Sequence, residues 1–379
     1  MSAQPGSPDA GLVAAQAAPS QEKPVDAAAP PATAPATGAT DLEKKVEELN
    51  INDGDKKVEA GEAPAAPPAA PVAEEKTTEP TAVALEDKKL DDAPAAVAPS
   101  TSGPTWPETG PEHPLTTFFN DLPELTKEAA HSEIWGIQLS ADNAFHTKLI
   151  LQKFLRANQN DLAKAKHQLS ETLKWRKEFD PVAAAQATYE KDVFEGLGYI
   201  IEAEGVPESA NEKDVVTFNI YGAVKDNKKT FGDLDRFLKW RVGLMERSVQ
   251  KLNLASATKP IPDYGQGPDP YQGVQIHDYL QVSFIRQDPV VKTATNKVIK
   301  TLGDYYPETL SRKFFVNVPA IMGWVFSAVK LVISKETARK FTVLSYGDQL
   351  AVELGKNIPK EYGGDRAELK EVGEGMALQ

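Results

Sequence analysis

One segment of the chain carries an imidazole and a phenol two residues apart, on what should be one face of a β-strand. Residues 274–284 alternate in polarity with a period of two, as a half-buried strand does. The polar set consists of Gln275, His277, Tyr279, Gln281 and Ser283. The opposite set is mostly apolar and consists of Ile276, Asp278, Leu280, Val282 and Phe284. The polar face therefore offers hydrogen-bonding groups to whatever covers it.

A similar alternation recurs in two other predicted strands. In residues 214–221 the matching set is Thr217, Asn219 and Tyr221, and in residues 313–318 it is Lys313, Phe315 and Asn317. A sheet enclosed between helical layers should be apolar on both faces. The repeated polar face therefore predicts either a filled cavity or a sheet that faces solvent, and we favour the cavity.

A predicted helix over residues 232–252 adds a cation. Its apolar stripe consists of Leu234, Leu238, Met245 and Val249, and Arg241 falls on that stripe. A cation on a buried stripe needs an anionic partner. That partner is either a ligand or a structural carboxylate, unless the side chain extends to solvent.

The rest of the sequence excludes several familiar kinds of site. There is no cysteine, which rules out disulfides, cysteine zinc sites, iron–sulfur ligation and a thiol nucleophile. Phosphate-binding loops, nucleophile elbows and zinc-protease motifs do not occur. Five histidines are scattered without metal-ligand spacing: His113, His131, His146, His167 and His277. We therefore expect a protein that is not an enzyme, and the charge pattern indicates no nucleic-acid partner.

Composition divides the chain near Trp106. All 29 aromatic residues lie at Trp106 or later, whereas residues 1–105 hold 15 of the 29 prolines and −10 of the formal −13 charge. We expect residues 1–105 to form a disordered Ala/Pro-rich acidic tail, because they cannot bury enough apolar surface to offset the entropy of ordering. The longest apolar run is too short to span a bilayer and no secretory signal is visible, so we expect a cytoplasmic protein.

The remaining residues predict an α/β fold in two lobes. Residues 106–181 have helical periodicity, with Asp161 as an N-cap, and should form a helical N-terminal lobe. Residues 182–379 should form a ligand-binding lobe, since strands at 214–221, 274–284, 313–318 and 341–344 alternate with helices at 232–252, 290–306 and 320–333. That order is typical of a mixed, mainly parallel sheet.

The sequence resembles the CRAL-TRIO, or Sec-fourteen-like, lipid-transfer family. The motifs that carry the resemblance are Lys153-Phe-Leu-Arg156, Trp175-Arg176, Tyr305-Tyr-Pro-Glu308, Phe315-Val-Asn-Val-Pro319, Lys335-Glu-Thr-Ala-Arg-Lys340 and Ile358-Pro-Lys-Glu-Tyr-Gly-Gly364. They occur in the order typical of the family. The resemblance implies a helical lobe, a lipid-binding α/β lobe and a gate helix, here about Ala320 to Ile333. It also implies that Glu308 and Lys340 recognise a phosphatidylinositol headgroup at a membrane surface.

The sequence is most similar to the fungal non-classical phosphatidylinositol-transfer and haem-binding subgroup of that family. The matching stretches are Gln275-Ile-His-Asp-Tyr279 and Leu173-Lys-Trp-Arg-Lys-Glu-Phe179. The resemblance implies haem b as a cofactor, with Tyr279 as the iron ligand and His277 beside it. Tyr221, Arg241 and Lys313 would complete the pocket. A tyrosinate is an established haem ligand, and nearby cations would stabilise the phenolate or pair with propionates.

Three functions therefore stay open at the level of sequence. The first, which we favour, is a carrier of phosphatidylinositol that also binds haem, with a role in phosphoinositide homeostasis or the oxidant response. Such a protein would be cytoplasmic and would associate peripherally with endoplasmic reticulum or microsomal membranes. The alternatives are an ordinary lipid-transfer protein without haem and a haem-dependent redox enzyme.

Overall fold

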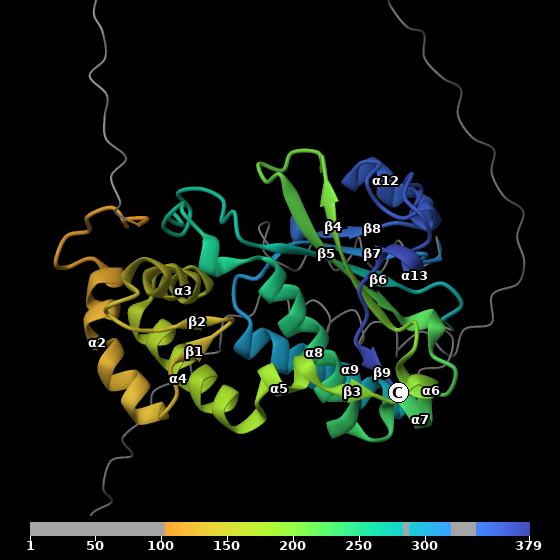
Figure 1. Cartoon of the computed structure of the whole chain (residues 1–379), viewed down its shortest axis with the longest axis horizontal. Coiled ribbons are helices and arrows are strands. Elements are labelled where there is room, and N and C mark those ends of the chain that lie inside the picture. The colour runs from red at the N-terminus through yellow and green to blue at the C-terminus, as the bar shows by residue number, and fades with distance from the viewer. Residues whose placement is uncertain (1–102, 283–287, 320–338) are drawn as a thin grey trace, which may run out of the picture. The chain divides into compact units, whose positions relative to one another are not determined.

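The computed structural model describes residues 103–282, 288–319 and 339–379 (Figure 1). Within these residues no helix is long and apolar enough to cross a membrane. The predicted tail and the predicted gate helix lie outside the described residues, apart from the last three residues of the tail.

Three helices form the N-terminal lobe: α2 (Pro114–Ala129), α3 (Ala144–Ala157) and α4 (Leu162–Phe179). The predicted cap is confirmed, because the Asp161 side chain accepts a hydrogen bond from the Lys164 amide at the start of α4. The expectation that the lobe is helical throughout is wrong at one point. A hairpin of two short strands, β1 (Glu133–Ile134) and β2 (Ile137–Gln138), joins α2 to α3.

Five strands form the main sheet in the order β4-β5-β6-β7-β8. They are β4 (Gly198–Glu204), β5 (Lys213–Ile220), β6 (Gly273–Asp278), β7 (Leu310–Val316) and β8 (Phe341–Val343). Strand β4 is antiparallel to β5, and the other pairs are parallel. The predicted mixed, mainly parallel sheet is confirmed, although β4 was not predicted and β6 ends at Asp278 rather than Phe284.

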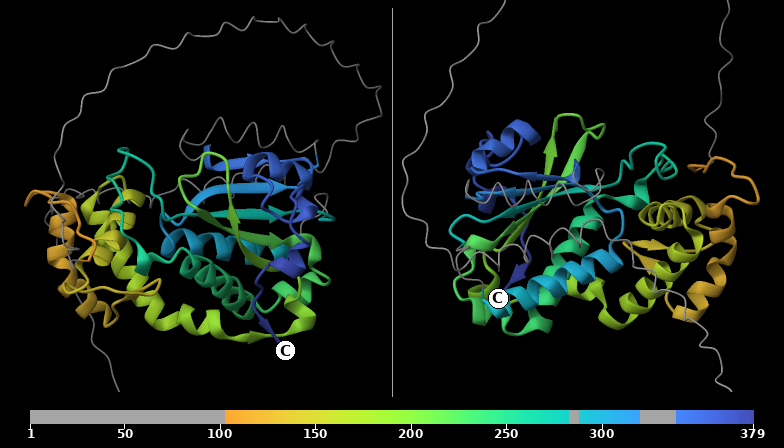
Figure 2. Two further views of the ribbon diagram at one scale, coloured as in Figure 1. Left: turned by 45° about the horizontal axis from the view of Figure 1, so that its top comes forward. Right: turned by 180° about the vertical axis from the view of Figure 1, so that it is seen from behind.

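Two long helices and several short elements complete the described chain (Figures 1 and 2). The long helices are α8 (Leu234–Lys251) and α9 (Pro289–Tyr305). The short helices are α5 (Pro181–Gln186), α6 (Lys191–Phe194), α7 (Asn227–Phe231), α12 (Leu350–Leu354) and α13 (Leu369–Val372). Strand β3 (Thr188–Tyr189) pairs in parallel with β9 (Ala377–Leu378). The described chain also contains short 3-10 helices: η1 (Tyr221–Ala223), η2 (Leu254–Ser256), η4 (Gly347–Gln349) and η5 (Lys360–Tyr362).

The two faces of the sheet are buried by different elements. One face is apolar and packs against α12, α13 and η5, in a core that includes Val216, Phe218, Ile276, Phe314 and Val316. The other face carries the polar residues and lies against α8, where Thr217 Oγ1 is 2.5 Å from Ser248 Oγ and Gln275 Nε2 is 3.3 Å from Met245 Sδ. The sheet therefore separates an ordinary apolar core from a buried polar layer.

Buried ion pairs attach the N-terminal lobe to the rest of the chain. Arg176 on α4 donates to both carboxylate oxygens of Glu246 on α8, at 3.0 and 2.7 Å, and also to Glu133. Lys153 on α3 donates to Asp269 at 2.6 Å and to the Tyr271 carbonyl at 2.7 Å. These two motif residues of the sequence therefore have structural roles.

Candidate functional site

The polar face of the sheet is buried. The exposed fractions are 0% for Thr217, 3% for Asn219, 9% for Gln275, 5% for His277 and 8% for Lys313. The alternative of a solvent-facing sheet is therefore wrong. Polar groups in such a place need partners from the protein or from a bound molecule.

A cluster of aromatic side chains occupies the carboxyl ends of β5 and β6. The Tyr221 hydroxyl lies 2.9 Å from His277 Nδ1, and His277 Nε2 lies 3.4 Å from Gln275 Oε1. The rings of Tyr221 and Tyr279 have centroids 5.2 Å apart. Both tyrosines were predicted on strands, but Tyr221 begins η1 and Tyr279 follows β6 by one residue. The structure nevertheless brings Tyr221, His277 and Tyr279 together.

Strand β7 supplies the neighbouring wall of this cluster. The strand register places Phe315 beside His277 and Lys313 beside Gln275. The Phe315 ring centroid is 5.6 Å from that of His277 and 6.3 Å from that of Tyr279. Lys313 Nζ lies 5.5 Å from the centroid of the Phe315 ring, over its face, which favours a cation.

Burial suppresses positive charge on this face. It lowers the pKa of Lys313 to about 7. Burial, and after it the charge of Arg241, lowers the pKa of His277 to about 3, so its imidazole is neutral at pH 7. Burial also lowers the pKa of Arg241, although the nearby Tyr221 and Tyr306 raise it. An anion bound here would restore the charged forms.

Arg241 itself is 4% exposed, so it does not extend to solvent. Its Nη1 atom is buried and has no hydrogen-bond partner among the described residues. Nor does any described carboxylate pair with it, in contrast to Arg176. The alternatives of a solvent-reaching side chain and of a structural carboxylate partner are therefore wrong for the described chain.

A second polar cluster lies at the opposite, amino-terminal ends of the parallel strands. Glu308 precedes β7 and Lys340 precedes β8, and Lys340 Nζ lies 3.8 Å from Glu308 Oε1. Lys340 also donates to the Leu310 carbonyl at 3.0 Å. The two residues predicted to recognise a headgroup are therefore adjacent in the fold, although 32 positions separate them in the sequence.

The position of Glu308 is fixed by residues that sequence reasoning missed. Its backbone has φ 51°, in the left-handed region, and its carbonyl accepts from Lys153 Nζ at 2.9 Å. Gln272, just before β6, donates to Glu308 Oε2 at 2.8 Å. Arg156 Nε lies 3.8 Å from the same oxygen. The Lys153-Phe-Leu-Arg156 motif was a signal for this role, but its partners are too distant in sequence to identify.

Most of the length of β7 separates the aromatic rings of the first cluster from Glu308, and Lys313 lies between them. This strand has seven residues, and a strand rises about 3.3 Å per residue, which gives roughly 20 Å. Among the described residues, no group of three His, Cys, Asp or Glu side chains could hold a metal ion. Iron held by a tyrosinate in a haem does not require such a group.

The chain belongs to the CRAL/TRIO family. A family model described as the CRAL/TRIO domain matches residues 205–364, and a model of the CRAL/TRIO N-terminal domain matches residues 114–171. The residues of both polar clusters lie within the first of these ranges, except Lys153 and Arg156, which lie within the second.

Several similar proteins come from fungi. A Phaeosphaeria nodorum protein named phosphatidylinositol transfer protein SFH5 is 68% identical over 279 residues, 74% of this chain and 84% of that protein. A Cryptococcus neoformans protein of the same name is 48% identical over 73% of this chain and 95% of its own length. A crystal structure of Sfh5 aligns with a TM-score of 0.58 and 27% identity, covering 70% of this chain and 93% of that one. The predicted family is confirmed.

Proposed function

We propose that the protein binds phosphatidylinositol and transfers it between membranes. The observation that carries the proposal is the adjacency of Glu308 and Lys340 at the ends of neighbouring strands. A lysine ammonium binds phosphate, and a carboxylate accepts hydrogen bonds from the hydroxyls of an inositol ring. The names of the similar fungal proteins support the same ligand.

Transfer requires binding and release but no covalent chemistry. The protein must replace water around the acyl chains, which is worth roughly 0.8 kcal/mol per buried CH₂. It must then return the lipid at a membrane, which makes peripheral membrane association part of the proposal. The predicted gate helix at Ala320–Ile333 would open for this step, and it lies outside the described residues.

The test is transfer of phosphatidylinositol between vesicles by Glu308→Gln and Lys340→Gln variants. Each should lose at least about tenfold in transfer rate, since a charge-assisted hydrogen bond contributes about 1.5–3 kcal/mol. Lys356→Gln is a matched control, because Lys356 Nζ donates to the Gly363 carbonyl at 2.8 Å as Lys340 Nζ does to that of Leu310. Wild-type protein that moves no phosphatidylinositol would overturn the proposal.

We also propose that the aromatic cluster binds haem b, with Tyr279 as the residue that would hold the iron. The observation that favours this second ligand is the buried guanidinium of Arg241, whose Nη1 has no hydrogen-bond partner among the described residues. The charge of Arg241 acts on Tyr221 and His277, which form one cluster with Tyr279. The donor set fits the group: a phenol for iron, a neutral imidazole, and two buried cations for carboxylates. When bound, the haem would supply redox-active iron.

The residues would have distinct tasks in that site. Tyr279 would bind as the phenolate, and Arg241 and Lys313 would favour that form by lowering the pKa of its hydroxyl or would pair with propionates. His277 stays neutral and accepts or donates one hydrogen bond with Tyr221. A role in the oxidant response and association with the endoplasmic reticulum stay predictions from the family resemblance.

The test is the visible spectrum of protein purified from cells supplied with a haem precursor. We expect a Soret band with ferric tyrosinate character in wild type and its loss in Tyr279→Phe. Tyr346→Phe is the matched control, because that side chain is 68% exposed. A colourless wild-type protein that still transfers phosphatidylinositol would leave the ordinary lipid carrier, whereas turnover above that of free haem would favour the redox enzyme.

A further inference from the structure

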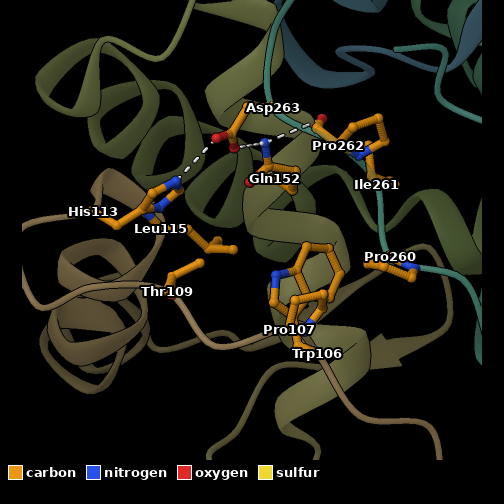
Figure 3. A pocket seen from close by; sticks show the side chains of 10 residues that line it. All are labelled: Trp106, Pro107, Thr109, His113, Leu115, Gln152, Pro260, Ile261, Pro262 and Asp263. Atoms are coloured by element: carbon orange, nitrogen blue, oxygen red, sulfur yellow. Dashed lines mark hydrogen bonds and ion pairs between the residues drawn. The ribbon is translucent and has the colours of Figure 1, made fainter. Parts of the chain in front are cut away.

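A pocket lies between the segment that precedes α2, helix α3 and the loop that follows η2 (Figure 3). Its volume is about 290 Å³, just below the roughly 300–1,000 Å³ of typical small-molecule sites. The apolar part of its lining consists of Trp106, Pro107, Leu115, Pro260, Ile261 and Pro262. The pocket is therefore suited to one or two small apolar residues rather than to a whole cofactor or lipid.

The pocket also contains a buried acceptor that lacks a donor. Gln152 on α3 lines the pocket and is 0% exposed. Its Nε2 donates to Asp263 Oδ1 at 2.9 Å and to the Pro262 carbonyl at 3.4 Å, which fixes the orientation of the amide. Its Oε1 therefore faces away from both acceptors and has no hydrogen-bond partner among the described residues. A bound N–H group would remove the cost of that unpaired acceptor.

The walls of the pocket are held in place by the fold. His113 Nδ1 accepts from the Leu115 amide at the start of α2, which leaves Nε2 to donate to Asp263 Oδ2 at 3.0 Å. Figure 3 shows that His113 and Gln152 both point towards Asp263. The ring of Trp106 packs on that of Phe145, with centroids 5.5 Å apart. The pocket is thus preformed, with an aromatic ring on one wall.

The chain itself supplies a segment of matching chemistry. Residues 64–71 read Pro-Ala-Ala-Pro-Pro-Ala-Ala-Pro, which is two P-x-x-P repeats without a charged residue. Segments with this repeat bind in aromatic-lined grooves, where the proline rings pack on the aromatic side chains. The alanines keep the N–H groups that proline lacks. Such a segment therefore offers both a ring for Trp106 and a donor for Gln152 Oε1.

The position of this segment in the chain favours it over a separate partner. Between Pro71 and Trp106 lie 34 residues, which can span up to about 110 Å, so the segment can reach the pocket. Covalent linkage gives it an effective concentration on the order of millimolar, at which even a weak site is occupied. We propose that residues 64–71 bind in this pocket of the same chain. The contact would hold part of the acidic tail against the N-terminal lobe.

The test uses a single spin label, which is possible because the sequence has no cysteine. Lys259 is exposed and directly precedes Pro260 of the pocket. A nitroxide on Lys259→Cys should reduce the NMR amide signals of the alanines in residues 64–71 about twofold or more, because the label broadens the signals of nearby nuclei. The same label on Lys356→Cys, exposed after α12 and outside the pocket, is the control and should leave these signals unchanged.

A variant of the tail alone keeps the test independent of folding. It combines Pro64→Ser, Pro67→Ser, Pro68→Ser and Pro71→Ser. It should abolish the signal loss, since serine has no ring to pack on Trp106, whereas Pro94→Ser with Pro99→Ser, outside the repeats, should not. Trp106→Ala should also abolish the loss, and thermal unfolding checks the fold of that variant.

Several outcomes would overturn the inference. One is an equal signal loss from the labels at positions 259 and 356, and another is a loss that persists in the combined serine variant. Absence of any loss would overturn it too. Mixing isotope-labelled chain with separate spin-labelled chain distinguishes the remaining occupant, because a loss as large as that within one chain would assign the pocket to the tail of a second copy.

Discussion

Helix α8 carries two buried charges, Glu246 and Arg241, that meet opposite environments. Glu246 is 0% exposed and accepts from Arg176 at 3.0 and 2.7 Å and from the Tyr306 hydroxyl at 2.7 Å. Arg241, five residues earlier, is 4% exposed and has Nη1 without a described partner. Burial is therefore common to the two charges, and incomplete pairing is what distinguishes Arg241 from Glu246.

The contrast has an electrostatic consequence. Although burial lowers the pKa of Arg176, the hydrogen bond and charge of Glu246 raise it overall, so this ion pair stays charged. On the sheet face the balance is reversed, and burial lowers the pKa values of Arg241, His277 and Lys313. The first cluster joins helices, and under the proposed function the second would gain stability when an anion binds.

The largest expected change in stability follows from removing the cation of the Arg176–Glu246 pair. Arg176→Met should lower the free energy of unfolding by about 3–5 kcal/mol, because it leaves the buried Glu246 carboxylate without the guanidinium that pairs with it. Urea denaturation of the protein without ligand measures the change. Lys174→Met, on the same helix, is the control, since the Lys174–Glu171 pair is exposed and should contribute no more than about 0.5 kcal/mol. Equal effects of the two variants would contradict the distinction.

The same substitution at the unpaired cation should act in the opposite direction. Arg241→Met should raise the free energy of unfolding of the ligand-free protein by about 1–3 kcal/mol, because it removes a buried group whose hydrogen bonds are incomplete. It should also raise the pKa of His277, which the charge of Arg241 lowers. Urea denaturation and an NMR titration of the imidazole measure the two effects. Destabilisation comparable to that of Arg176→Met would show that Arg241 has a structural partner.

The sheet was largely predictable because period-two alternation reports which residues share a face. Tyr221 and Tyr279 were predicted within strands, and each lies one residue beyond the end of its strand, yet both lie on the predicted side beside His277. Strand β4 was missed because its seven residues lack a clear alternation, and the β1–β2 hairpin because two-residue strands leave no periodic signal.

The candidate site was predictable only where a residue type and a motif coincide. The stripe of α8 indicated Arg241, and the family motifs indicated Glu308 and Lys340. Gln272 and Arg156 were missed as members of the second cluster. Arg156 and Glu308 lie 152 positions apart, and only the docking of α3 against the strand ends brings them together. No local pattern encodes such a contact.

The smallest expected effect, counted per pH unit, is the change of the free energy of unfolding with pH that Lys313 causes. Its pKa is about 7 in the folded protein, against an ordinary value of 10.5 in the unfolded chain. Between these values the unfolded chain binds more protons, so stability should rise with pH by up to about 1.4 kcal/mol per pH unit from pH 7 to 10.5. Urea denaturation across this range measures the slope. Lys313→Met should remove it, whereas Lys174→Met should not, and a wild-type profile flat above pH 7 would mean that Lys313 keeps its ordinary pKa through an anionic partner.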